Sequence, residues 1–124
     1  MGLVMDLTEE ARAHAKICDH LLEAVASKTT VDAAALRSDR QCGAGRWLHG
    51  PIQQRWAGNH TYLNCVEAHR EFHQAASEVA DLINRGEYAE ANRRLRNGSR
   101  LAMATSTLTT AFRRMRLAME AVTA

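Results

Sequence analysis

The chain of 124 residues carries 16 Lys and Arg against 14 Asp and Glu, so its formal net charge is only +2 with neutral histidines. This small excess argues against a nucleic-acid partner, since proteins that bind nucleic acids usually carry a strong basic patch. No apolar run approaches the ~20 residues of a membrane-spanning helix, and the N-terminus lacks the basic and apolar regions of a signal peptide.

The cysteine count and the composition indicate the compartment and the fold class. Three cysteines are an odd number, which fits a reducing compartment better than a disulfide framework, so we expect a cytoplasmic protein. A single proline and few aromatic residues favour helices over strands. We predict one all-α domain over 1–124, an antiparallel four-helix-bundle-like fold of three long helices and a short helix.

The first predicted helix spans residues 7–27. Asp6 as N-cap and Glu9 three residues later form a capping-box pattern. An apolar stripe with alternating spacings of four and three follows. Its members are Leu7, Ala11, His14, Cys18, Leu21 and Val25. His14 and Cys18 should therefore point toward the core, one helical turn apart.

A short helix is expected at about 39–49, after a connection over 28–38. Ser38 followed by Gln41 is a second capping pattern. Cys42 would lie in the first turn of this helix, where the partial positive charge of a helix N-terminus favours thiolate over thiol. Thiolate is the form of cysteine that binds metal ions.

The second long helix is predicted over 60–85, after a brief helical turn at 51–58. Asn59 is a suitable N-cap, and Gly86 a suitable end. The inward stripe of this helix contains two histidines. Its members are Tyr62, Val66, His69, His73, Ala76, Ala80 and Ile83.

His69 and His73 would lie on adjacent turns, with their Cβ atoms ~5–6 Å apart. Two imidazoles at this spacing can share one metal ion. A pair of hydrogen-bonded core histidines is the simpler interpretation, because an unpartnered polar ring in a core is costly. Cys65 lies one turn before His69, on the same side of the helix.

The last helix is predicted as one continuous element over 87–121. Its inward stripe again alternates spacings of four and three. Its members are Leu101, Thr105, Leu108, Phe112, Met115, Met119 and Val122. The segment Asn97-Gly98-Ser99 could kink or interrupt this helix.

Taken together, the inward-facing polar residues could form a tetrahedral zinc site. They are His14, Cys18, Cys42, Cys65, His69 and His73. Three histidines with one cysteine are a complete ligand set, and nitrogen and sulfur ligands favour zinc over calcium or magnesium. No inward carboxylates accompany them, which argues against a di-iron carboxylate centre. Spacing alone leaves open which of the three cysteines binds the metal.

Three motifs resemble those of the chemoreceptor zinc-binding domain, the CZB family. They are His14-Ala15-Lys16-Ile17, Cys42-Gly43-Ala44-Gly45-Arg46-Trp47 and His69-Arg70-Glu71-Phe72-His73. The resemblance extends over about residues 10–120, in the order and at the separations typical of that family. It departs at Ile17, where an aromatic residue is frequent, and at Ala44, which replaces a bulkier apolar residue.

The resemblance implies a zinc ligand set of His14, Cys42, His69 and His73, and thereby selects Cys42 among the cysteines. Five residues are then expected to pack near the site: Ile17, Cys18, Gly45, Trp47 and Cys65. The resemblance also implies a non-catalytic, homodimeric sensory domain of bacterial chemotaxis or cyclic-di-GMP signalling. Such a domain would respond to zinc and, through the zinc-bound Cys42, to oxidants such as hypochlorous acid. The signalling partner or output domain is not indicated by the sequence.

Two alternatives follow from the same residues. A catalytic zinc would keep a coordination position for water and need a general base, whereas Glu71 has the wrong helical phase, so we expect no enzyme. The other alternative is a protein- or nucleic-acid-interaction module with a purely structural zinc. Its basis is a group of arginines, for which a solvated helix face is the simpler interpretation. They are Arg93, Arg94, Arg96, Arg100, Arg113, Arg114 and Arg116.

Overall fold

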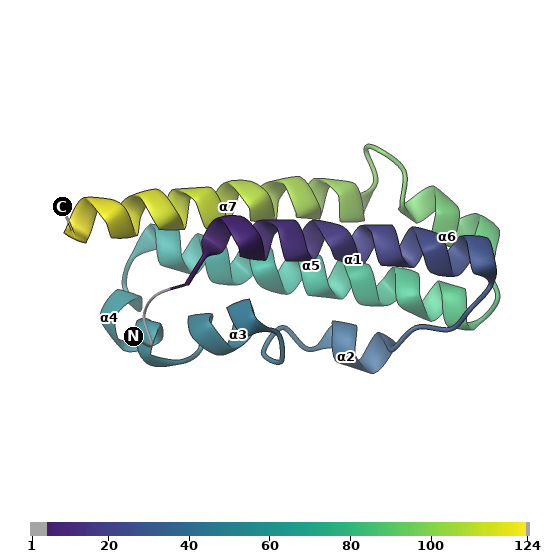
Figure 1. The fold of residues 1–124 in the computed structure, drawn as a ribbon, viewed down its shortest axis with the longest axis horizontal. Helices are drawn as coiled ribbons and strands as arrows, with labels where there is room; N and C mark the ends of the chain where they lie inside the picture. Colours follow the sequence, from purple (N-terminus) through teal and green to yellow (C-terminus); the bar gives the residue numbers. More distant parts are fainter. Residues whose placement is uncertain (1–4, 124) are drawn as a thin grey trace.

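A computed structural model of the chain describes residues 5–123. Within this range the chain forms seven helices and no strand, which confirms the predicted all-α bundle. Three long helices, α1 (Leu7–Ser27), α5 (His60–Asn84) and α7 (Arg100–Thr123), lie side by side along the molecule (Figure 1). None of the helices in the described range combines the length and apolar character needed to cross a membrane.

Side-chain caps begin two of the long helices where the sequence predicts them. The Asp6 carboxylate accepts the Glu9 N–H at 3.0 Å at the start of α1. The Asn59 side chain accepts the Tyr62 N–H, also at 3.0 Å, at the start of α5. Each bond satisfies a backbone donor that has no partner within the helix. Gly86 follows α5 with a φ of 77°, in the left-handed conformation that commonly ends helices.

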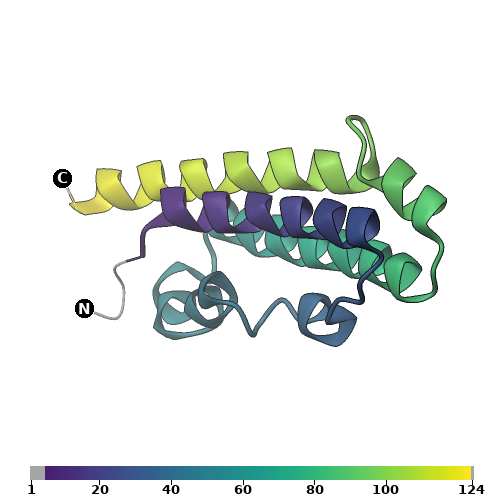
Figure 2. The same ribbon diagram turned by 45° about the vertical axis from the view of Figure 1, so that its right-hand side comes forward.

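The prediction of one continuous helix over 87–121 is wrong. The structure has two helices here, α6 (Tyr88–Arg94) and α7, which are separated by the turn at 95–99. Gly98 has a φ of 84° in this turn, a conformation that side chains disfavour and glycine permits. The chain therefore changes direction between α6 and α7, as the loop in Figure 2 shows.

Three short helices form an arm that joins α1 to α5: α2 (Ala33–Arg37), α3 (Gly43–Leu48) and α4 (Pro51–Trp56). The arm runs back along the bundle, below α5 in Figure 1. The predicted helix over 39–49 begins later than expected, at Gly43. The reason is that the Ser38 hydroxyl accepts the Arg40 N–H within a turn and caps no helix.

Hydrogen bonds hold the arm to α5 at two places. At one end, the Asn84 side chain accepts the Val31 N–H at 2.8 Å and donates to the Val31 carbonyl at 2.9 Å. Further along the arm, at the last residue of α3, the Tyr62 hydroxyl donates to the Leu48 carbonyl at 2.6 Å. Trp47 and Leu48 are buried in the core, so α3 is anchored on the bundle beside α1 and α5.

Candidate metal centre

Four side chains from three separate elements meet between α1, the arm and α5. His14 comes from the middle of α1, and His69 and His73 from successive turns of α5. Cys42 precedes α3 directly. The three histidines are 0–3% exposed and the cysteine is half-buried. Their ligand atoms all lie within 4.8 Å of one another, so the structure brings together the set that the CZB resemblance implies.

Five of the six separations between these atoms are close to the edges of a zinc tetrahedron, and the sixth, between the ligand atoms of His14 and His73, is no more than 4.8 Å. His69 Nε2 lies 3.2 Å from His14 Nε2 and 3.1 Å from His73 Nε2. Cys42 Sγ lies 3.2–3.8 Å from the same three nitrogens. Zn–N bonds of ~2.0–2.1 Å and Zn–S bonds of ~2.3 Å place tetrahedral nitrogens about 3.3 Å apart, and sulfur about 3.6 Å from nitrogen. The group therefore has the size of a four-coordinate zinc site.

Backbone carbonyls orient two of the imidazoles. His14 Nδ1 lies 2.7 Å from the Glu10 carbonyl oxygen, and His73 Nδ1 lies 2.9 Å from the Leu36 carbonyl oxygen. A carbonyl only accepts hydrogen bonds, so both Nδ1 atoms must carry the proton. Both Nε2 lone pairs then point at the centre of the group, as in metal-binding histidines whose other nitrogen is hydrogen-bonded.

Two phenylalanines form an apolar wall around the histidines. The His14 ring centroid lies 5.2 Å from that of Phe72 and 5.6 Å from that of Phe112, and both phenylalanines are fully buried. Burial lowers the pKa of all three histidines. The pKa of His69 falls to about 3, because burial is reinforced by the neighbouring imidazoles. The histidines are therefore neutral, which is the form that binds metal.

The sequence did not identify the phenylalanines as site residues. Phe112 was assigned to an ordinary core stripe, and Phe72 appeared only inside the His-x-x-x-His motif. The available signal was that Phe72 follows His69 by three residues and so shares its side of the helix. Nothing in the sequence linked Phe112, which lies 40 residues after Phe72 in a different predicted helix, to the same histidines. Only the packing of α7 against α5 brings both phenylalanines to the histidines.

Cys42 caps α3 through its sulfur, which accepts the Gly45 N–H at 3.3 Å. The sequence predicts that the helix N-terminus favours the thiolate at this position. In the structure burial raises the pKa of the Cys42 thiol, and the Gly45 N–H lowers it by less. The N-terminus of α3 thus acts in the predicted direction, while burial opposes it. A divalent cation beside the sulfur is the remaining influence that would favour the thiolate.

The other residues that the sequence places near the site are not part of the group of four possible metal ligands. Cys18 is half-buried, with its sulfur 3.5 Å from the Thr105 hydroxyl between α1 and α7. Cys65 is fully buried, and burial raises its pKa to about 12. Ile17 is half-buried against the core, and Trp47 is 5% exposed. Among the described residues, neither Cys18 nor Cys65 joins the metal-binding group.

Gly45 is buried where the turn before α3 approaches it closely. A Cβ atom at this position would lie 2.1 Å from the Asp39 carbonyl oxygen and 2.9 Å from the Arg40 Cα. Real Cβ atoms do not approach other atoms so closely, so only glycine fits here. The close approach of the turn before α3 thus explains why a glycine stands at this buried position.

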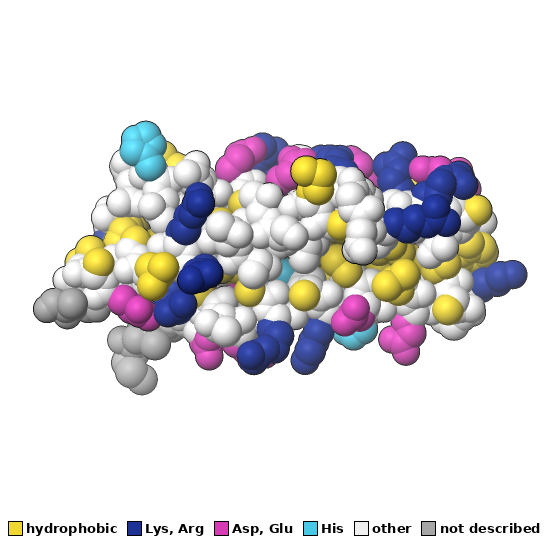
Figure 3. Space-filling model, turned by 90° about the horizontal axis from the view of Figure 1, so that it is seen from above, with side chains coloured by type: hydrophobic (Ala, Val, Ile, Leu, Met, Phe, Trp, Pro, Cys, Tyr) yellow, Lys and Arg dark blue, Asp and Glu magenta, His cyan; other side chains and the backbone are white. Residues whose placement is uncertain are grey.

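Many of the acidic and basic side chains outside the group form ion pairs on the surface. Glu71 pairs with Arg100 and points away from the histidines, as its helical phase predicts. Several of the arginines proposed as a basic face are also paired with glutamates: Arg93, Arg94, Arg100 and Arg116. Acidic and basic side chains are interspersed on the face seen in Figure 3. This pattern favours a solvated helix surface over a nucleic-acid-binding one.

Comparison of the chain with protein-family models, curated proteins and solved structures finds no match. Function is therefore inferred from the geometry and chemistry of the group itself. Three histidines and one cysteine, largely buried and within metal-binding distance, fit a zinc site.

Proposed function

We propose that this chain is a non-catalytic, zinc-binding regulatory domain of the CZB type. The observation that carries this proposal is the tetrahedral spacing of three imidazole nitrogens and one sulfur. This donor set favours zinc over calcium or magnesium. Four protein ligands would also close the site, whereas catalytic zinc sites keep a position for water. The three sequence motifs that resemble the CZB family support the same assignment.

A regulatory role is supported by where the ligands lie in the chain. His14, Cys42 and the α5 histidines belong to α1, the arm and α5, so metal occupancy would tie these three elements together. Loss of the metal would weaken that junction and shift the packing of the arm. We propose that this shift is the signal passed to a partner or output domain in bacterial chemotaxis or cyclic-di-GMP signalling.

Cys42 is also proposed as the oxidant-sensitive element. It is the only sulfur in the group, and it is half-buried whereas the histidines are fully buried. Hypochlorous acid would transfer its oxygen to the thiolate, giving a sulfenic acid and releasing chloride. The oxidised sulfur is a poorer ligand, so the zinc would be held by the histidines alone.

Metal analysis of the purified protein, followed by competition with a graded zinc chelator, tests the proposed function. We expect one zinc per chain and release of that zinc after treatment with hypochlorous acid. A Cys18→Ala, Cys65→Ala double variant is the control, because it retains Cys42 alone and should release zinc in the same way. A wild-type protein without zinc would contradict the metal assignment. Zinc release that disappears in the double variant would contradict the role of Cys42.

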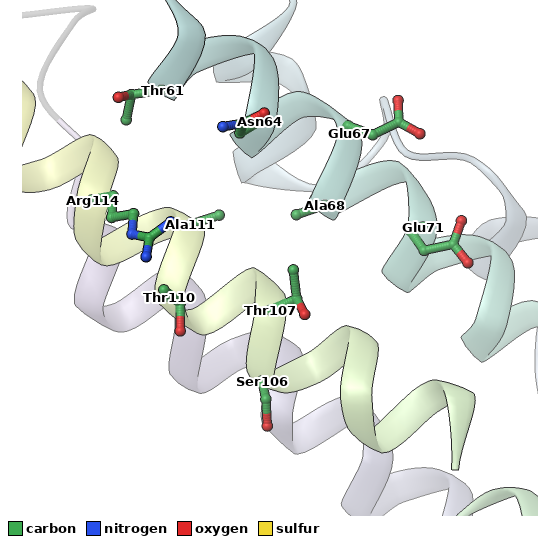
Figure 4. A pocket seen from close by; sticks show the side chains of 10 residues that line it. All are labelled: Thr61, Asn64, Glu67, Ala68, Glu71, Ser106, Thr107, Thr110, Ala111 and Arg114. Atoms are coloured by element: carbon green, nitrogen blue, oxygen red, sulfur yellow. The ribbon is translucent and has the colours of Figure 1, made fainter. Parts of the chain in front are cut away.

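We further propose that the chain forms a homodimer through the groove between α5 and α7. Figure 4 shows this groove, with Ala68 and Ala111 pointing toward each other across it. Small side chains dominate its lining and would allow helices of a second copy to approach closely. The lining residues are Thr61, Asn64, Glu67, Ala68, Glu71, Ser106, Thr107, Thr110, Ala111 and Arg114.

Charge complementarity favours a second copy of this chain as the occupant. The α5 side of the groove carries Glu67 and Glu71, which pair with Arg70 and Arg100 of the same chain, and the α7 side carries Arg114. A two-fold axis parallel to the helices would set α5 of one protomer against α7 of its partner, so that carboxylates face guanidinium groups. Met103 and Leu117 lie on the outer face of α7, 63% and 47% exposed, and would be covered in such a dimer.

A Thr110→Glu variant should be monomeric under conditions in which the wild-type protein is a dimer. The introduced carboxylate would face Glu67 and Glu71 of the partner, and such like-charge contacts oppose association. Thr109→Glu is the matched control, because Thr109 is exposed on α7 but does not line the groove. Light scattering over a range of protein concentrations measures the mass. A monomeric wild type, or equal masses for the two variants, would contradict this interface.

A further inference from the structure

Glu10 contacts His14 and the first turn of α3, which follows Cys42, but is not itself one of the four residues of the metal-binding group. It lies on α1 one turn before His14, and its backbone carbonyl accepts the His14 Nδ1–H at 2.7 Å. Its carboxylate lies against the first turn of α3, near the backbone N–H of Ala44. The carboxylate oxygens lie 3.6 and 3.9 Å from the position of a Cβ atom at Gly43. One half-buried residue thus links the histidine of α1 to the helix that follows Cys42.

The position of Cys42 depends on the orientation of the first turn of α3. This helix has six residues, too few to be stable without contacts to the rest of the protein. The Gly45 N–H donates to the Cys42 sulfur, and the Ala44 N–H lies near both that sulfur and the Glu10 carboxylate. The contact with Glu10 therefore connects α3 to α1, which carries His14.

The side chains of Glu10 and of its neighbour Glu9 differ in their surroundings. The Glu10 carboxylate is half-buried against the first turn of α3. Glu9 is exposed and pairs with Arg12. The contact with α3 therefore belongs to Glu10, and Glu9 provides a matched control position.

We propose that Glu10 is a positioning residue of the metal site, whose carboxylate holds the first turn of α3 so that Cys42 and His14 stay at ligand distance. This inference rests on the proposed zinc site. Residues that contact and orient metal ligands, without binding the metal themselves, commonly lower metal affinity about 10–100-fold when they are substituted. Glu10 would have this role.

Three variants test the role of Glu10: Glu10→Ala, Glu10→Gln and the control Glu9→Ala. We expect Glu10→Ala to lower zinc affinity about 10–100-fold. In the cobalt-loaded protein it should also weaken the sulfur-to-cobalt charge-transfer band, because Cys42 is displaced. Glu10→Gln should restore most of both signals, since an amide oxygen can accept the Ala44 N–H. Glu9→Ala should match the wild type, and circular dichroism of each metal-free variant reports folding.

The outcomes separate this inference from the proposed function. Zinc binding by the wild type with unchanged affinity in Glu10→Ala would overturn the role of Glu10 alone. Equal losses in Glu10→Ala and Glu10→Gln would show that the charge matters and the hydrogen bond does not, which also overturns the positioning role. A wild-type protein that binds no zinc would overturn the proposed function, and this inference with it.

Discussion

Replacing His69 with alanine should lower zinc affinity by more than about 100-fold, since even outer-shell substitutions cost up to that factor. His69 Nε2 is the most central of the ligand atoms. It lies 3.2 Å from His14 Nε2, 3.1 Å from His73 Nε2 and 3.2 Å from the Cys42 sulfur. Its removal would leave three ligands and open a coordination position to water.

Thermal unfolding with and without zinc measures this effect. Free zinc at 100 times Kd should stabilise the wild type by about 2.7 kcal/mol, whereas His69→Ala should gain almost nothing at the same concentration. His69 Nδ1 has no hydrogen-bond partner among the described residues, so the substitution breaks no bond there in the metal-free protein. His20→Ala, at an exposed position of α1, is the control. Equal stabilisation of the wild type and His69→Ala by zinc would contradict the assignment.

Gly45→Ala should lower the free energy of unfolding by roughly 1–3 kcal/mol, the usual cost of overpacking a buried position. The new Cβ would overlap backbone atoms of Asp39 and Arg40, which cannot move aside as a flexible side chain could. The Gly45 N–H also donates to the Cys42 sulfur. Displacement of α3 should therefore weaken zinc binding in addition to stability.

Gly58→Ala is the matched control for Gly45→Ala. No atom lies within 4 Å of the position that its Cβ would take. Gly58 is also not one of the described glycines with a positive φ, which are Gly86 and Gly98. We expect a change within about 0.5 kcal/mol, as for most surface substitutions. Denaturant unfolding of both metal-free variants, with zinc titration of the folded proteins, provides the comparison. Similar losses in the two variants would show that the close contact at Gly45 is not the cause.

The periodicity of apolar residues predicted which faces are buried better than it predicted where helices end. The stripes through α1 and α5 match their buried faces, and both helices begin at predicted N-caps. The stripe over 87–121 is also largely buried from Leu101 to Met115. Yet a four-three pattern reports burial and not backbone continuity. The break depends on the left-handed conformation at Gly98, which the pattern does not contain.

The pairing of His69 with His73 was predictable because it is local, four residues apart on one helix. The choice of Cys42 over Cys18 and Cys65 was not predictable from spacing and came only from the family resemblance. In the structure it follows from the path of the arm, which returns along α5 and brings Cys42 Sγ to the histidines. The effect of burial on the Cys42 thiol was not predictable, because burial is a tertiary property that opposes the local effect of the helix terminus.

The sequence by itself determined the helical class, the inward faces of the long helices and the types of ligand available. These depend on short-range periodicity and on side-chain chemistry. The tertiary structure decided which cysteine meets the histidines, which carbonyls orient the imidazoles and which phenylalanines exclude water from them. Those features depend on distances between residues far apart in the chain, and such distances are set by how helices pack rather than by any local pattern.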